Sequence, residues 1–237
     1  MPKVTFSLDG HIALVTLNDG ENRFNPPFLK TFSSVLDEIE HRSEVSTLVV
    51  ASAHEKIFSN GIDLQWLEPV LKADDREAVT AFLRDMMGLF RRILLYPMPT
   101  IAAISGHAFA GGAIMSCAFD FRFMRSDRGF FCFPEVDLGI PFLPGMLAII
   151  GKAIPAPTFQ EMQLTGRRAT AKECEAAGIV LKAFPRDDLI SESVEFAKSL
   201  NKRRAVVSEM KQRMYKEVVR ILDEEDPPLI DSGRFFV

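Results

Sequence analysis

The chain has 237 residues, of which 47% are apolar and 25% charged, and its formal net charge is −4. A chain of this length and apolar content can bury one sizeable core, and its basic and acidic residues are interspersed along the sequence. This composition argues against a protein that binds nucleic acid or an anionic membrane surface. The sequence contains no run of about 18 apolar residues, the length that predicts a helix spanning a bilayer.

Strands and helices alternate along the chain. Alternating or short apolar runs predict strands, at 3–8, 11–17, 47–51, 100–105, 121–124, 130–133 and near 180. Helical spacing of apolar residues and capping signals predict helices, at 28–42, from 64, 78–96, from 111, 142–153, 157–164, 171–177, 187–204 and 206–222. Repeated strand-strand-helix and strand-helix units predict an α/β fold. Residues 224–237 are predicted to form a loosely held tail.

The cysteines and histidines indicate neither a disulfide framework nor a metal site. Cys117, Cys132 and Cys174 are far apart and odd in number, which favours a reducing compartment. The four histidines have no ligand spacing among themselves or with the cysteines, so we expect no metal. The first residues lack the pattern of a signal peptide. We therefore expect a soluble protein, cytoplasmic if the chain is bacterial; the sequence leaves a peroxisome or another organelle open.

Two loops rich in small residues each lie between a predicted strand and a predicted helix. The first is SNG at 59–61, and the second is SGHAFAGG at 105–112. A helix start offers free N–H groups and the positive end of its dipole, and glycine lets a ligand approach them. Two such loops could aim two backbone donors at one oxygen, as an oxyanion hole does. Either loop alone is more ordinarily a tight connection with glycine in a left-handed conformation.

Several motifs in one order resemble the crotonase superfamily, which comprises enoyl-CoA hydratases and isomerases. The motifs are FSNGIDL at 58–64, PTIAAISGHAFAGG at 99–112, PEVDLGIPFLPG at 134–145 and LTGRRATAKECEAAGIV at 164–180. The resemblance extends over residues 4–183. Three stretches are most similar to short isomerases of the plant peroxisomal kind: NRFNP at 22–26, FSNGIDLQW at 58–66 and FMRSDRGFFCFPEVDLGI at 123–140.

The resemblance implies a crotonase-like spiral of strand-strand-helix turns with an acyl-CoA site in residues 1–186. A C-terminal helical region and tail would occupy 187–237. The resemblance also implies a homotrimer or dimer of trimers, and no cofactor, because coenzyme A is part of the substrate. The thioester oxygen would be held by the backbone N–H groups of Ile62 and Gly111. The substrate-binding residues would be Ser59, Asn60, Asp63, Leu64 and Ile114.

The resemblance assigns the acid-base chemistry to one residue, Glu135. Hydratases of this family position water with two carboxylates, but the position of the first is occupied here by Ile114. A single acid in an apolar pocket has a raised pKa and can take a proton at one carbon and return it at another. The pattern therefore predicts a 3,2-enoyl-CoA isomerase of fatty-acid oxidation with Glu135 as the catalytic residue.

Two other functions stay open at this point. One is hydration or another crotonase-type reaction, in which Asp137 or a water network replaces the missing acid; on a continuing strand Asp137 would share the face of Glu135. The other is a non-catalytic member that only binds acyl-CoA.

Four further side chains have a functional and an ordinary interpretation. Asp63 is expected to cap the helix that begins at Leu64, besides its place in the binding motif. His107 could be a base, although a loop histidine bonded to backbone is the more ordinary role. Arg23 and Lys56 are candidates for the coenzyme A phosphates by their proximity to the matched loops, or they lie on solvated faces.

Overall fold

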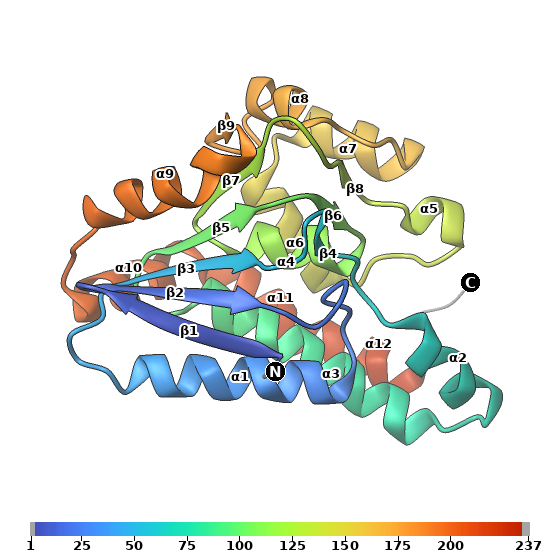
Figure 1. The fold of residues 1–237 in the computed structure, drawn as a ribbon. Coiled ribbons are helices and arrows are strands. Elements are labelled where there is room, and N and C mark those ends of the chain that lie inside the picture. The colour runs from blue at the N-terminus through green and yellow to red at the C-terminus, as the bar shows by residue number, and fades with distance from the viewer. Residues whose placement is uncertain (1–2, 234–237) are drawn as a thin grey trace.

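The computed structural model describes residues 3–233, which form a mixed α/β fold with helices at its C-terminal end (Figure 1). The strands are β1 (Val4–Asp9), β2 (Ile12–Leu17), β3 (Thr47–Ser52), β4 (Ile57–Ser59), β5 (Thr100–Ile104), β6 (His107–Phe109), β7 (Phe121–Arg125), β8 (Phe131–Cys132) and β9 (Lys182–Phe184). The helices are α1 (Pro26–Glu40), α2 (Leu64–Lys72), α3 (Arg76–Leu94), α4 (Gly111–Ala118), α5 (Glu135–Leu138), α6 (Pro144–Ala153), α7 (Ala156–Thr165), α8 (Ala171–Ala176), α9 (Arg186–Lys198), α10 (Arg204–Met214), α11 (Lys216–Glu224) and α12 (Asp226–Ser232). The predicted fold class is confirmed.

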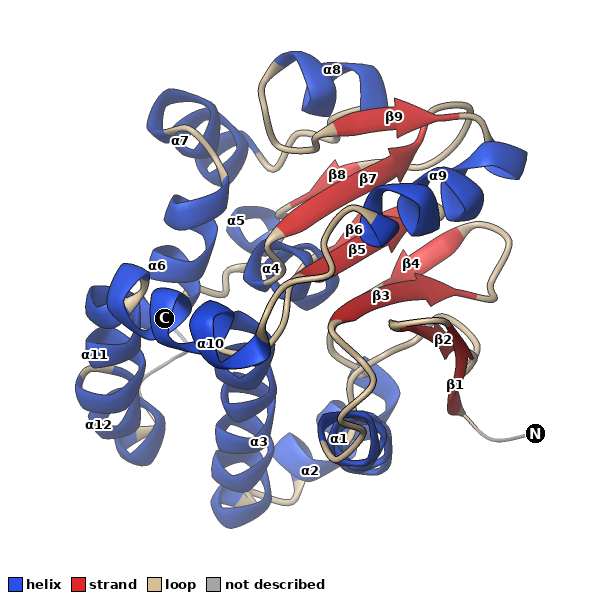
Figure 2. Ribbon diagram, turned by 90° about the vertical axis from the view of Figure 1, so that its left-hand side faces the viewer, coloured by secondary structure: helices blue, strands red, loops and turns tan. Residues whose placement is uncertain are grey.

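The larger sheet has six strands in the order β1-β2-β3-β5-β7-β9, and only the β1–β2 pair is antiparallel. Helix α9 packs against one face of this sheet, while the main core lies on the other face with α1, α3 and α4 (Figure 2). The central strands β3 and β5 are buried almost throughout, which explains why their sequences are nearly continuous apolar runs.

A second sheet of three short parallel strands, β4-β6-β8, positions the functional loops. Carboxyl ends of parallel strands meet at one edge of a sheet, where ligands of α/β proteins bind. The SNG loop follows β4, the AGG segment follows β6, and Glu135 comes three residues after β8. This sheet therefore brings together three segments that are far apart in the sequence.

The chain turns sooner after β8 than expected. The predicted strand at 130–133 contains only two β residues, and α5 begins at Glu135. Asp137 is therefore on a helical turn and does not share a strand face with Glu135. A Cβ atom placed on Gly166 would lie 2.5 Å from Asp137 Oδ2, so this carboxyl group packs beside the end of α7. The alternative in which Asp137 shares a continuing strand with Glu135 is therefore not supported, and Asp137 does not line the cavity described below.

The C-terminal region also differs from its prediction. The helix predicted over 206–222 is interrupted at Tyr215 and continues as α11. The tail predicted to be loosely held instead forms α12, in which Asp226 and Ile230 are buried, while residues 234–237 of that tail lie outside the described part of the chain. The predicted division at residue 186 stays a prediction. No helix in residues 3–233 is long and apolar enough to cross a membrane.

Candidate active site

A cavity of about 300 Å³ lies at the carboxyl ends of β4, β6 and β8. Its wall is largely apolar, and a few polar groups converge on it, which is typical of small-molecule sites. The residues that line it from the three loops include Asn60, Ile62, Ala110, Gly111 and Glu135. The apolar wall includes Leu64, Leu67, Val79, Phe82, Leu83, Met86, Ile114, Phe142, Leu143 and Met146.

Two free backbone donors lie close together in this cavity. A Cβ atom placed on Gly61 would lie 2.7 Å from the backbone nitrogen of Gly111, so the two loops touch at this point. Within residues 3–233, neither the N–H of Ile62 nor that of Gly111 donates a hydrogen bond. Gly111 is the first residue of α4, where the helix dipole is positive. The pair can therefore receive an oxygen that gains negative charge.

A strained turn presents the Gly111 donor. Ala110 has φ +49°, a conformation that residues with a Cβ atom rarely adopt and that is found more often at functional sites. Its N–H donates to the carbonyl of Cys132 at 3.1 Å, and its carbonyl accepts from Ile114 at 3.0 Å. Gly112 is required because a Cβ atom there would lie 2.3 Å from the carbonyl oxygen of Ser59.

Two basic side chains, Lys152 and Arg122, hold the other end of α4. The carbonyl of Phe119, the residue that ends this helix, accepts hydrogen bonds from Lys152 Nζ at 2.7 Å and Arg122 Nη1 at 2.9 Å. Positive charge at the carboxyl end of a helix interacts favourably with its dipole. The helix is thus fixed at its carboxyl end and carries a free donor at its amino end.

The catalytic candidate Glu135 has the properties of a buried acid. Its residue is 7% exposed, and its Oε2 atom is buried with no hydrogen-bond partner among the described residues. This burial raises the pKa of Glu135 to about 7. Near neutral pH the carboxyl group can therefore both accept and release a proton.

Glu135 is the single carboxylate among the described residues that line the cavity. Ile114 faces the same space from α4 and is almost fully buried. Ile114, which occupies the position where the resemblance implies a first carboxylate, therefore lies in the cavity wall and adds apolar surface to it.

The structure places only some of the predicted binding residues at the cavity. Asn60, Leu64 and Ile114 line it, but Ser59 and Asp63 do not. Ser59 is fully buried, and its hydroxyl donates to the carbonyl of Asn22 and accepts from the N–H of Gly61. Asp63 caps α2 and accepts a hydrogen bond from the Asn25 amide. These two side chains shape the loop that carries the Ile62 donor.

Of the other polar candidates, Arg23, Lys56 and His107, only Arg23 lies at the cavity. Arg23 lines the cavity and is bound to the carboxylate of Glu21, with Nε at 2.8 Å. Lys56 is not among the lining residues. The ring of His107 stacks on Phe109 with centroids 5.1 Å apart, and burial lowers the pKa of this histidine. His107 also lies outside the cavity lining, so its role there is packing.

Helix α3, predicted from the sequence over 78–96, divides its apolar residues between the cavity wall and the core. In the structure, Val79, Phe82, Leu83 and Met86 line the cavity, while Met87, Phe90 and Ile93 are core residues. The spacing of the four lining residues marks one helix face, but periodicity cannot tell a cavity from a packed core.

No three His, Cys, Asp or Glu side chains in residues 3–233 gather as the ligands of a metal ion would.

Comparison with known proteins places these features in context. The family model described as enoyl-CoA hydratase/isomerase matches residues 8–225. Enoyl-CoA delta isomerase 2, a peroxisomal protein of Arabidopsis thaliana, is 31% identical over 232 residues, which cover 93% of this chain and 95% of that protein. A putative enoyl-CoA hydratase of Thermus thermophilus is 33% identical over 196 residues, which cover 81% of this chain and 76% of that protein.

Solved structures share the fold at lower sequence identity. A probable enoyl-CoA hydratase of Mycobacterium tuberculosis superposes with a TM-score of 0.88 at 21% identity, covering 98% of this chain and 96% of that chain. An enoyl-CoA hydratase/isomerase family protein of Pseudomonas syringae gives 0.88 at 23% identity, with 97% of each chain covered.

Proposed function

The chain belongs to the enoyl-CoA hydratase/isomerase family, as its motifs predicted, and on that basis we propose that it moves the double bond of a 3-enoyl-CoA into conjugation with the thioester. The proposal includes no bound cofactor, because coenzyme A enters as part of the substrate. It also includes assembly as a homotrimer or a dimer of trimers, and a place in fatty-acid oxidation. A relative is named as peroxisomal, while a cytoplasmic location suits a bacterial chain.

The proposed reaction is a proton transfer between two carbons of one substrate. Glu135 in its carboxylate form takes a proton from C2, and the electron pair moves onto the thioester oxygen to give a dienolate. The N–H groups of Ile62 and Gly111 stabilise this oxyanion, and one such donor typically lowers the barrier by ~3 kcal/mol. Glu135 then returns its proton to C4, so no atom is gained or lost and the new double bond lies between C2 and C3.

One observation favours isomerisation over hydration. The cavity brings a single buried carboxylate with a pKa of about 7 to two free backbone donors, within a wall that is otherwise mostly apolar. Hydration would require a water molecule held and activated in that space, and family hydratases use two carboxylates for this. Ile114 removes one of them.

The assay that tests the proposal compares two substrates of the purified protein. With a 3-enoyl-CoA, we expect the ultraviolet absorbance of a conjugated enoyl thioester to appear. With a 2-enoyl-CoA, we expect this absorbance to persist, whereas a hydratase would remove it. Absence of a signal with 3-enoyl-CoAs of every chain length would refute the isomerase. Loss of the 2-enoyl-CoA absorbance would then indicate a hydratase, and its persistence would indicate an acyl-CoA binder.

The rate should depend on pH through Glu135. Its carboxyl group must be ionised to take the first proton, and burial raises its pKa from 4.5 to about 7. We therefore expect kcat/KM to increase with pH through about 7 and then to level off, as measured in initial-rate assays with the free enzyme. A profile that is already flat between pH 5 and 8 would assign the base to another group.

A further inference from the structure

The last two helices of the described chain lie beside α3 and α6, two of the helices that line the cavity. Figures 1 and 2 show α11 and α12 next to α3 and α6, and the packing of α11 on α6 and of α12 on α3 agrees with these views. Helix α3 lines the cavity with four apolar side chains, and α6 contributes Met146. The C-terminal helices therefore pack against α3 and α6, which form two walls of the cavity.

Asp226 binds the amino end of α6. Its Oδ1 atom accepts the backbone N–H of Gly145 at 2.7 Å, although 81 residues separate the two in sequence. The local N-cap position of α6 is Leu143, whose side chain cannot accept a hydrogen bond. Asp226 is 1% exposed, and a Cβ atom on Gly145 would lie 2.2 Å from its Oδ2 atom. This distant aspartate thus replaces the local cap, and Gly145 makes room for it.

Two more carboxylates of the same segment bind α3. Asp223 accepts two hydrogen bonds from Arg91, at 2.8 and 3.0 Å, and Asp231 pairs with Arg84. The two arginines are seven residues apart, so they lie on one face of the helix. Exposed ion pairs stabilise a fold only weakly, but this geometry ties the segment to α3 at two points. We call Asp223, Asp226 and Asp231 the carboxylate clasp.

The α6 end held by the clasp continues directly into the catalytic loop. Residues 140–143 run from α5 to α6 and line the cavity, and Glu135 begins α5. A shift of the α6 amino end would therefore move Leu143 and Met146 relative to Phe82 and Met86. Because interiors are close-packed, a small shift of this wall changes which chain fits.

We propose that the carboxylate clasp fixes the separation of α3 and α6 and thereby sets the acyl-chain length that the cavity accepts, with Asp226 as the positioning residue. This inference rests on the proposed acyl-CoA substrate. Asp226 does not line the cavity and acts through α6, so its role is selectivity for the acyl tail and not proton transfer.

Binding of saturated acyl-CoAs tests the clasp without any turnover. Trp66, the sole tryptophan, packs against the cavity residue Phe82 with ring centroids 4.7 Å apart, so its fluorescence reports occupancy. The probes are butanoyl-, octanoyl- and dodecanoyl-CoA. We expect Asp226→Ala to change the ratio of Kd values between the best and the longest probe by about fivefold to tenfold in favour of the longer, the size of effect a lost cap produces. Asp226→Asn keeps the acceptor and should retain the wild-type ratio.

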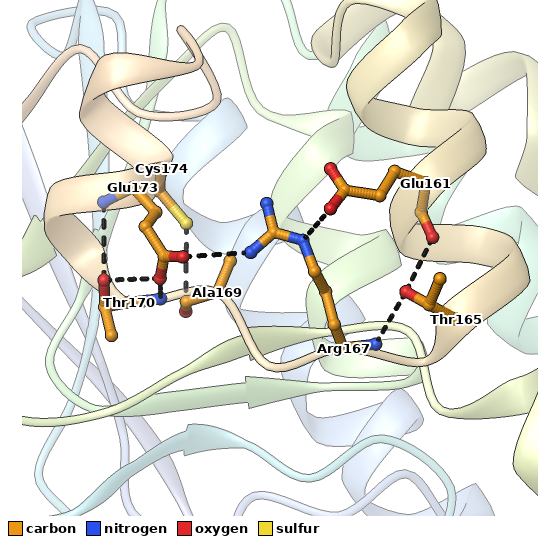
Figure 3. A network of polar contacts seen from close by, with 7 residues as sticks. All are labelled: Glu161, Thr165, Arg167, Ala169, Thr170, Glu173 and Cys174. Carbon is orange, nitrogen blue, oxygen red and sulfur yellow. Dashed lines mark hydrogen bonds and ion pairs between the residues drawn. The ribbon is translucent and has the colours of Figure 1, made fainter.

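The matched control removes a helix cap elsewhere. Thr170 caps α8 within the network of Figure 3, and no residue drawn there lines the cavity. Thr170→Ala should leave the Kd ratio unchanged. If Asp226→Ala does not fold, the exposed Asp223→Asn change loosens the same clasp and should shift the ratio in the same direction by a smaller factor.

An equal loss of affinity for all three probes would overturn the proposed role of the carboxylate clasp. An unchanged Kd ratio in the variants that fold would overturn it too. Either outcome is separate from failure of the proposed reaction, since a protein that binds acyl-CoAs with clasp-dependent selectivity yet converts no 3-enoyl-CoA refutes only the isomerase.

Discussion

Glu135→Gln is expected to reduce double-bond migration by roughly 10³-fold or more, because the only carboxylate among the described cavity residues is lost and general acid-base catalysis contributes about 10² to 10⁴. Binding of a saturated acyl-CoA should be largely kept, since the amide has nearly the same shape. Initial rates and Kd values of the same preparation measure both. Turnover within tenfold of wild type would remove Glu135 from the mechanism.

The same substitution should stabilise the fold at high pH. The pKa of Glu135 is raised from 4.5 to about 7 in the folded protein, so ionisation opposes folding. Below pH 4.5 the group is neutral in both states and costs nothing; between 4.5 and 7 the cost builds up, and above 7 it is complete at ~3 kcal/mol. The unfolding free energy of Glu135→Gln relative to wild type should increase by about this amount from pH 4.5 to 8.

Denaturant unfolding at the two pH values gives that difference, and comparing variant with wild type cancels the other titrating groups. The opposite sign, a variant that loses relative stability as the pH rises, would mean that Glu135 has a stabilising partner when ionised. Gain of stability with loss of activity would show that the buried carboxyl group is kept for chemistry and not for folding.

The second large effect is expected from Gly61→Ala. The new methyl group would lie 2.7 Å from the Gly111 nitrogen and 3.1 Å from the carbonyl oxygen of Phe109, where it blocks the oxyanion donors. We expect kcat to fall by about 10² to 10³, the effect of losing such a donor. The measurement is kcat for a 3-enoyl-CoA.

A second glycine variant separates the effect of backbone strain at Gly61 from the effect of blocking the backbone donors. Gly178 has φ +72°, close to the +71° of Gly61, but a Cβ atom there meets nothing within 4 Å. Gly178→Ala should therefore introduce the same backbone strain without the close contact and leave kcat nearly unchanged. If both variants lose kcat equally, strain and not access to the donors is the cause.

The motifs predicted that Ile62, Gly111 and Glu135 share one site, and all three line the cavity because a motif places backbone groups by spacing. The side chains of Ser59 and Asp63, predicted for the same site, lie outside the cavity lining. Gly61, Gly111 and Glu135 come together because each follows a strand of one small parallel sheet. The sheet itself was largely missed: β4 and β6 have three residues each, which is too short for an alternating pattern to be visible.

The apolar wall and the C-terminal region were harder to predict for physical reasons. Helix α3 has one hydrophobic pattern that serves both the core and the cavity. Residues 224–237 were predicted to be a loosely held tail, yet Pro227 and Pro228 lie in the first turn of α12, where proline lacks only an N–H that would be unpaired. The partner of Asp226 is 81 residues away, and no local signal indicates such a cap.

Helix α4 has one consequence for the precision of the reaction. Its eight residues span ~12 Å, with Lys152 and Arg122 bonded at one end and the Gly111 N–H at the other. A hydrogen-bonded helix resists compression along its axis, so it transmits a displacement of its anchored end as a rigid rod does. The position of the Gly111 N–H therefore depends partly on two side chains outside the cavity lining, Lys152 and Arg122. In the proposed mechanism, a shift of either side chain would misalign this donor with the thioester oxygen.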